Sequence, residues 1–412
     1  MVKRLLLAFC IFIGTAVSAQ TRVFLIGDST TETWKGSSWY PCKGWGAVLQ
    51  YFFDRDKVVV DNRAVGGTTT KIFYNEHWAK VISDIGEGDF LFISFGANDS
   101  NLSAIYCTTP EEFINYIGMF CNEARAKGAT PVLLSTVNQN SWNSQKHLNS
   151  SYGQHPKAMK EAADKYETPF IDLYSFGFNL SKEVGQEYNT FYRHNNYKPG
   201  EYDNYPEGKK DNVHLQEMGA IDYSRYIVEE IEKSKDERLE LLADATTPRY
   251  YVTFEADNDS LMASISRSAT FPEGINVTLK SYGVDENKQC FWRNASGEII
   301  SKSHVYVYVM QNHDEHFVAI YNDSSLLQKY VDDFKIYRDR IVFYDNKIHT
   351  VSIFTFNGRF VTSASTTYNY PFNLKTGAYI LTIDGIKKHE DYDRIICVHI
   401  RICLKSYIVE DC

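Results

Sequence analysis

Short apolar runs alternate with amphipathic stretches along the first half of the chain. Such runs, bounded by polar turns, are typical of buried strands, and they occur at residues 23–26, 58–60, 90–95, 131–135 and 170–173. Apolar positions three and four residues apart indicate helices at residues 110–126, 156–166 and 216–233. Because strands that alternate with helices form parallel sheets covered on both faces, we predict an α/β fold with a three-layer αβα sandwich.

The pattern changes after the charged run at residues 229–240. Strict alternation of apolar and polar positions, as at residues 250–254 and 305–309, indicates strands. We therefore predict an α/β domain over residues 20–240, a β-rich domain over 246–334 and a β-rich C-terminal module over 335–412. Trp292 and other aromatic residues of the second domain could stack on sugars, although core packing is their more common role.

The N-terminus predicts secretion. Lys3 and Arg4 precede an apolar run at residues 5–13, and small residues follow up to Ala19. This order is typical of a signal peptide, here residues 1–19, and the apolar run is too short to span a membrane. We expect a secreted, periplasmic or cell-surface protein. The formal net charge of −9 argues against nucleic acid and anionic membranes as partners.

The cysteines indicate neither a metal site nor a closed set of disulfides. Of the eight cysteines, Cys10 lies in the signal peptide, so an odd number remains. Cys107 and Cys121 could pair in an oxidising compartment, or they could be two separate buried thiols. Since no metal-ligand spacing occurs either, we predict neither a metal nor another cofactor.

Two short segments carry candidate chemistry. Gly27-Asp28-Ser29-Thr30 directly follows the first predicted strand, and Asp211-Asn212-Val213-His214 precedes the last predicted helix. A serine hydroxyl becomes a nucleophile when an adjacent base takes its proton, and an imidazole can do so near neutral pH. An aspartate three residues before a histidine can orient that imidazole. The pair therefore predicts a Ser-His-Asp hydrolase, although each segment alone is more typical of an ordinary turn.

Two further strand-to-loop junctions lie between these segments. Asn62 to Thr68 and Gly96-Ala97-Asn98-Asp99 each follow a predicted strand. Ligands of an open α/β sheet bind at the carboxyl ends of its strands. A glycine N–H and an asparagine amide are suitable donors for an oxyanion, whereas the alternative is two common Gly/Asn turns.

These four blocks resemble those of the SGNH (GDSL-type) hydrolases, and more closely those of the rhamnogalacturonan acetylesterases. The resemblance covers residues 20–235 and implies a flavodoxin-like fold. It implies that Ser29 is the nucleophile, His214 the base and Asp211 its orienter. It also implies an oxyanion hole made by the backbone N–H groups of Ser29 and Gly67 and the side chain of Asn98.

Substrate contacts are predicted at three positions. Thr68 and Thr69 stand where members of this family often have Arg-Ser, a departure that affects the contacts with substrate and not the reaction type. We predict Thr68 as one of these contacts. Residues 186–210 are polar, rich in Tyr, Asn and Gly, and lead directly into Asp211, which indicates a long loop beside the site. Arg193 and His194 in this loop could touch substrate, while two solvated loop residues are the alternative.

The resemblance implies a secreted serine esterase that removes O-acetyl groups from plant cell-wall polysaccharide, with pectic rhamnogalacturonan as the expected substrate. The alternatives are a lipase or general esterase of the same fold, and a catalytically silent carbohydrate-binding protein. Residues 351–359 and 374–381 resemble the C-terminal sorting domains of Bacteroidota secretion, which would imply a bacterial source. A structural β module is the competing interpretation of that region.

Overall fold

The computed structural model describes residues 20–102, 107–256, 265–281, 290–321, 334–336, 340–343, 349–355, 359–367, 369–371, 377–383, 395–400 and 409–410. The predicted signal peptide and parts of the two segments that resemble a sorting domain lie outside these residues. The chain divides into two compact units, Met1–Pro248 and Arg249–Cys412. No described helix has both the length and the apolar character needed to cross a membrane.

The first unit is built on a five-stranded parallel sheet. Its strands are ordered β2-β1-β3-β4-β5, and they span Thr21–Gly27 (β1), Val58–Asn62 (β2), Phe90–Ser94 (β3), Thr130–Leu134 (β4) and Phe170–Ile171 (β5). From β1 the chain adds β2 towards one edge of the sheet, and β3, β4 and β5 are then added towards the other edge, so the switch point lies between β1 and β3. Open sheets of this type bind ligands outside the carboxyl ends of the strands at that switch point.

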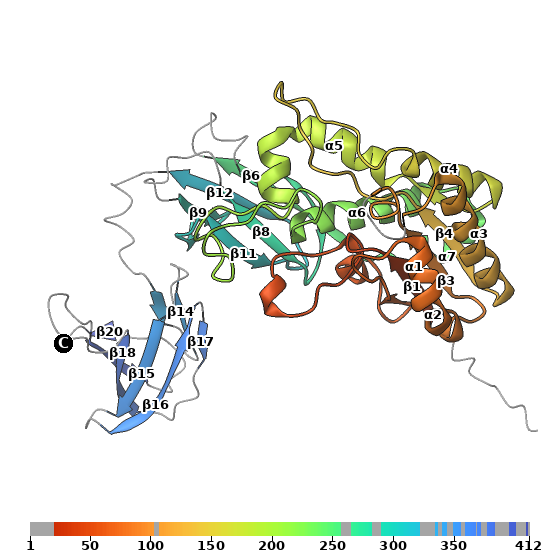
Figure 1. Cartoon of the computed structure of the whole chain (residues 1–412). Helices are drawn as coiled ribbons and strands as arrows, with labels where there is room; N and C mark the ends of the chain where they lie inside the picture. The colour runs from red at the N-terminus through yellow and green to blue at the C-terminus, as the bar shows by residue number, and fades with distance from the viewer. Residues whose placement is uncertain are drawn as a thin grey trace, which may run out of the picture. The chain divides into compact units, whose positions relative to one another are not determined.

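Helices flank the sheet on both faces (Figure 1). They span Thr70–Glu76 (α1), Trp78–Asp84 (α2), Pro110–Ala126 (α3), His155–Lys165 (α4), Leu173–Tyr188 (α5), Glu217–Lys233 (α6) and Glu240–Ala243 (α7). Phe24 and Ile26 of β1 share one apolar core with residues of α1 to α4. Leu25 faces the opposite side, against the 3-10 helix Trp45–Ala47, whose Trp45 carbonyl accepts a hydrogen bond from Ser224 of α6 at 2.8 Å. The predicted three-layer α/β sandwich is confirmed.

The second unit is rich in strands, as predicted for this half of the chain. One five-stranded sheet has the order β10-β9-β12-β6-β7, and β11 pairs with β8. These strands span Arg249–Ala256 (β6), Ala269–Pro272 (β7), Asn276–Lys280 (β8), Cys290–Asn294 (β9), Ile299–Ser301 (β10), Val305–Val309 (β11) and Glu315–Tyr321 (β12). Trp292 is 0% exposed, so it belongs to the core and cannot stack on a sugar.

Further strands follow towards the C-terminus. They form two sheets, β13-β14-β17 and β16-β15-β18-β19-β20. Their bounds are Phe334–Ile336 (β13), Arg340–Phe343 (β14), His349–Thr355 (β15), Phe360–Thr366 (β16), Asn369–Pro371 (β17), Gly377–Ile383 (β18), Ile395–Ile400 (β19) and Val409–Glu410 (β20). In the first unit Cys107 and Cys121 are free thiols, the first half-buried and the second buried, so of the two alternatives for this pair the structure has separate thiols.

Candidate active site

Three side chains from the two ends of the first unit form one hydrogen-bonded line. Ser29 Oγ lies 3.0 Å from His214 Nε2, although the two residues are 185 positions apart in the chain. His214 Nδ1 lies 2.8 Å from Asp211 Oδ2. A serine, an imidazole and a carboxylate in this order can pass the serine proton to the imidazole and stabilise the resulting charge.

The turn after β1 holds Ser29 at the carboxyl edge of the sheet. The carbonyl of Asp28 accepts hydrogen bonds from the N–H groups of Thr31 and Glu32, which closes the turn. Its buried carboxyl accepts from the backbone N–H and the hydroxyl of Thr30 through Oδ1, while Oδ2 has no hydrogen-bond partner among the described residues. Burial raises the pKa of Asp28 to about 6.

Asp211 is held as a carboxylate. The N–H groups of Val213 and His214 both donate to Oδ1 at 3.1 Å, which folds the Asp-x-x-His segment into a compact turn. Asn195 donates to Oδ2 at 3.3 Å, and the Lys209 ammonium lies 3.7 Å from the same oxygen. Burial alone would raise the pKa of Asp211, but the hydrogen bonds and charge of His214 outweigh it and hold this pKa well below its ordinary value.

The loop after β2 lies against the nucleophile. Asn62 donates through Nδ2 to the Thr31 carbonyl at 2.7 Å, which ties this loop to the serine turn. A methyl group added at Gly66 would lie 3.4 Å from Ser29 Cβ. The next residue, Gly67, has a φ of +79°, a conformation that favours glycine, and it is exposed.

The loop after β3 brings Asn98 to the same region. Asn98 Nδ2 donates to the Thr68 carbonyl at 3.0 Å. A carboxamide has two N–H groups, so this bond orients the side chain and uses one of them. The neighbouring Asp99 is buried and accepts from the hydroxyls of Thr70 at 2.6 Å and Thr108 at 2.9 Å. These bonds fix the loop that carries Asn98.

Trp34 forms part of the surroundings of the triad that the sequence did not indicate. Its indole N–H donates to the Ser29 carbonyl at 2.9 Å, and its ring packs edge-on to that of His214 at 5.2 Å. Trp34 has a φ of 51°, which is rare for a bulky residue and is found at sites that the surrounding structure constrains. Its ring also contacts that of Trp39 at 4.8 Å, and Trp39 is 43% exposed.

Two of the three predicted substrate contacts lie in the core. Arg193 is 1% exposed and pairs with Asp222 of α6 at 3.0 Å. His194 is 0% exposed, and its ring nitrogens face the carbonyls of Asn189 and Asn138. Burial lowers the pKa of His194 to about 4. Neither side chain reaches the surface, which contradicts the predicted contact with substrate. Both brace the segment that leads to Asp211, whose residues Asn189–Arg193 form a π-helix and not part of the predicted loop.

The third predicted contact, Thr68, stays a prediction. Its hydroxyl donates to the Val65 carbonyl at 2.7 Å, and its own carbonyl accepts from Asn98.

Within the described parts of the chain, no three His, Cys, Asp or Glu side chains are grouped so that they could hold a metal ion.

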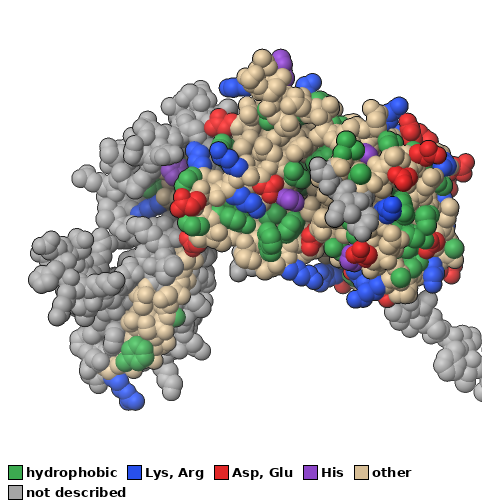
Figure 2. Space-filling view, viewed as in Figure 1, with side chains coloured by type: hydrophobic (Ala, Val, Ile, Leu, Met, Phe, Trp, Pro, Cys, Tyr) green, Lys and Arg blue, Asp and Glu red, His purple; other side chains and the backbone are tan. Residues whose placement is uncertain are grey.

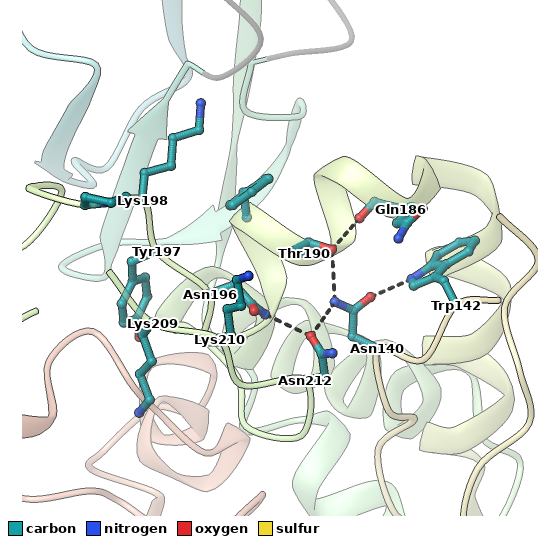
Figure 3. Close-up of a pocket in the computed structure, with 12 residues that line it drawn as sticks. Asn140, Trp142, Gln186, Thr190, Asn196, Tyr197, Lys198, Lys209, Lys210 and Asn212 are labelled. Atoms are coloured by element: carbon teal, nitrogen blue, oxygen red, sulfur yellow. Dashed lines mark hydrogen bonds between the residues drawn. The ribbon is translucent and has the colours of Figure 1, made fainter. Parts of the chain in front are cut away.

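An open pocket of about 410 Å³ adjoins the Asp211 turn (Figure 3). Three of its lining residues contact Asp211 or follow it in the chain: Asn196, Lys209 and Asn212. The full lining is Asn140, Trp142, Gln186, Thr190, Phe191, Asn196, Tyr197, Lys198, Pro199, Lys209, Lys210 and Asn212. Elsewhere on the visible face, acidic and basic side chains are interspersed (Figure 2).

Known proteins resemble the first half of this chain. The sequence profile described as the GDSL-like lipase/acylhydrolase family matches residues 25–220. The rhamnogalacturonan acetylesterase RhgT of Bacillus subtilis (strain 168) is 34% identical over 216 residues, which are 52% of this chain and 90% of that protein. The probable rhamnogalacturonan acetylesterase YesY of the same organism is 28% identical over 214 residues, 51% of this chain and 92% of that protein. The crystal structure of an acetylxylan esterase from Geobacillus stearothermophilus has a TM-score of 0.39 at 17% identity and covers 51% of this chain and 93% of that one.

Proposed function

Because this chain belongs to the GDSL-like lipase/acylhydrolase family and is a carboxylic ester hydrolase, we propose that it removes O-acetyl groups from plant cell-wall polysaccharide, with rhamnogalacturonan as the substrate. The observation that carries the proposal is the line from Ser29 through His214 to Asp211. The substrate is supported by the 34% identity to a rhamnogalacturonan acetylesterase over nearly the whole length of that enzyme.

Acylation starts at Ser29. Its Oγ attacks the acetyl carbonyl carbon while its proton passes to His214 Nε2, and the anionic Asp211 stabilises the imidazolium. The carbonyl oxygen becomes an oxyanion, which accepts hydrogen bonds from the N–H groups of Ser29 and Gly67 and from Asn98. When the tetrahedral intermediate collapses, the sugar oxygen leaves with the proton from His214 and the acetyl group stays on Ser29.

Deacylation repeats these steps with water. His214 takes a proton from the water molecule, whose oxygen attacks the acetyl carbonyl. The second tetrahedral intermediate expels Ser29 Oγ, which recovers its proton from His214, and acetate is released. We also propose that the protein is secreted, on the strength of the signal-peptide pattern in residues 1–19, and that its source is a bacterium, on the strength of the resemblance of residues 351–359 and 374–381 to bacterial sorting domains.

The test is acetate release from a panel of substrates. Purified protein is incubated with acetylated rhamnogalacturonan, acetylated xylan and a triglyceride, with Ser29→Ala as the blank. We expect acetate from rhamnogalacturonan at the highest kcat/KM. Faster hydrolysis of the triglyceride would identify a lipase, and faster hydrolysis of xylan would keep the acetylesterase but change the polymer.

A further inference from the structure

The geometry points to the pocket beside Asp211 as a subsite for an acidic sugar, a uronate residue of the polymer that carries the acetyl group. This inference rests on the proposed function. The pocket has a volume of about 410 Å³, which lies within the usual range of ligand pockets. Arg193 and His194 are buried, so within residues 186–210 only other side chains can contact the substrate. Several side chains of these residues, among them Asn196 and Lys198, line the pocket.

The polar wall of the pocket is held in place by hydrogen bonds. Asn140 is buried, and its Nδ2 donates to Thr190 at 3.0 Å and to Asn212 Oδ1 at 3.2 Å. The indole N–H of Trp142 donates to Asn140 Oδ1 at 2.6 Å. Figure 3 shows these side chains linked along one side of the pocket. The network fixes an aromatic ring and carboxamides together, and a sugar presents matching apolar faces and hydroxyl groups.

Asn212 is the member of this network that is best placed to bind a ligand. It is exposed, and both bonds that it accepts, from Asn140 and from Asn196 at 3.3 Å, use its oxygen. Its amide N–H donors therefore remain for a hydroxyl or carboxylate of the ligand.

The charge of the lining favours an anion. Three of the twelve lining residues are lysines, and none of those twelve is acidic. This contrasts with the formal net charge of −9 of the whole chain. Lys210 is exposed, and Lys198 is half-buried with its ammonium 5.8 Å from the centre of the Phe191 ring. A carboxylate is the anionic group of a plant cell-wall sugar that such ammonium groups would pair with.

The pocket is joined directly to the catalytic turn. Asn196 donates to the Asp211 carbonyl at 2.9 Å and accepts from the Asp211 N–H at 3.1 Å. Lys209 contributes to the lining and lies 3.7 Å from the Asp211 carboxylate. Because lining and catalytic residues share this segment, a sugar bound in the pocket is anchored beside the turn that carries His214. The pocket then selects acidic polymers over neutral ones.

The experiment compares two forms of one substrate. Acetylated rhamnogalacturonan oligosaccharides are used with free carboxylates and after methyl esterification, which removes the charge. We expect the wild-type KM to be lower for the acidic form by about three- to tenfold, the scale of two partly exposed ion pairs, and this ratio to fall as salt is added. In the double variant Lys198→Met/Lys210→Met the ratio of the two KM values should approach one.

Lys127→Met is the matched control. Lys127 is an exposed lysine at the end of α3, next to the amino ends of β3 and β4, whereas Ser29 lies at the carboxyl end of β1. This variant should keep the wild-type ratio. Thermal melting of each variant checks that it is folded.

Each outcome decides between the two proposals. A double variant that is folded and keeps the wild-type ratio overturns the uronate subsite, as does a wild-type enzyme with equal KM values for both forms. In either case acetate release still supports the acetylesterase. If the wild-type protein releases no acetate from any polysaccharide, the proposed function itself fails.

As a second variant, Trp142→Ala should raise KM for both forms alike, because the ring would contact the sugar whatever its charge. An unchanged KM for both forms would show that no sugar occupies the pocket.

Discussion

At the scale of single residues, the chemistry of the candidate site depends on a few groups whose surroundings fix their protonation and orientation. Asp211 stays ionised because its carboxylate accepts four hydrogen bonds from backbone and side-chain donors. His214 is oriented by Asp211 on one side and by the edge of Trp34 on another. A nucleophile and base this close should act as a unit, so removal of one abolishes the benefit of the other.

Ser29→Ala is therefore expected to lower kcat for p-nitrophenyl acetate by about 10⁶-fold, as loss of the nucleophile does in other triads. The variant should melt at a temperature close to that of the wild type. Residual activity above a few percent, in a preparation shown to be free of contaminating esterase, would mean that Ser29 is not the nucleophile.

Asn98→Ala tests the oxyanion hole. We expect kcat to fall by about 10²- to 10³-fold with little change in KM, because the amide interacts mainly with the charge that develops in the transition state. Asn122, an exposed asparagine on α3, provides the control, and Asn122→Ala should behave as wild type. A raised KM at unchanged kcat would make Asn98 a residue that binds the substrate in its ground state.

Asp28→Asn gives a prediction for pH dependence. Burial raises the pKa of Asp28 to about 6, above its value in the unfolded chain, so the folded wild type binds the proton more tightly. This contribution to stability is present below the unfolded pKa of about 4 and is lost as the pH rises through 6. The variant has no such titration. We compare the free energy of unfolding of the variant minus that of the wild type at each pH. This difference should be higher at pH 8 than at pH 4, by up to about 3 kcal/mol.

Urea unfolding at the two pH values measures this difference. The comparison between pH values matters more than either value alone, because a buried amide N–H without a partner lowers stability at every pH. An equal difference at pH 4 and pH 8 would show that Asp28 does not carry a raised pKa.

The residues of the triad could be predicted from sequence, whereas much of their surroundings could not. Ser29, Asp211 and His214 lie in short local segments whose order and spacing indicate their chemistry. Trp34 contacts Ser29 and His214 from an unusual backbone conformation, and no local pattern of the sequence indicates it. Arg193 looked exposed because its neighbours are polar, but its partner Asp222 lies 29 positions away on α6.

At the scale of elements, local signals explain which helices the sequence predicts. The predicted helix 110–126 agrees with α3, because Thr109 and Glu112 form a capping box, Pro110 occupies the first turn, and Lys127-Gly128 ends the helix. The predicted strand at residues 170–173 is too long. Asp172 instead caps α5 by accepting a hydrogen bond from the Ser175 N–H, and Leu173 already belongs to that helix.

Helix α5 itself was not predicted, because two glycines interrupt its pattern. Gly185 has a φ of 81° and marks a kink near its C-terminal end. Gly177 lies where a β-carbon would come within 1.9 Å of the Tyr223 hydroxyl. That hydroxyl donates to Asn138 at 2.8 Å. The glycine is therefore required by tertiary packing, which outweighs its low intrinsic preference for helices.

Gly177→Ala should accordingly destabilise the protein, although alanine is the better helix former. We expect a loss of about 1–3 kcal/mol in the free energy of unfolding, typical of overpacking a full core. A β-carbon at Gly177 would meet two oxygens, the Tyr223 hydroxyl and Asn138 Oδ1, and Tyr223→Phe removes the first of them. Adding Tyr223→Phe to Gly177→Ala should therefore cost less than the sum of the two single changes. Additive effects in this double-mutant cycle would show that the hydroxyl does not set the need for glycine.

At the scale of the whole molecule, all residues assigned to catalysis lie in the first unit, which ends at Pro248. The segment just before this boundary is bonded to the α/β fold. Asp54 donates to the Ala245 carbonyl at 2.8 Å, and Thr247 donates to the Phe52 carbonyl at 3.0 Å. A protein that ends near residue 240, as the sequence pattern suggested, would lose both bonds, so the cut belongs after Pro248.

A protein of residues 20–248 should therefore fold and hydrolyse p-nitrophenyl acetate with the kcat of the full chain, since it retains the triad, the three oxyanion donors and the pocket beside Asp211. The same fragment with Ser29→Ala is the blank. If the second unit binds polysaccharide, the fragment should show a higher KM on polymer and an unchanged KM on the small ester; if it only sorts or spaces, both values should match the full chain. A fragment that is soluble and folded by circular dichroism but inactive on the small ester would mean that residues after 248 complete the active site.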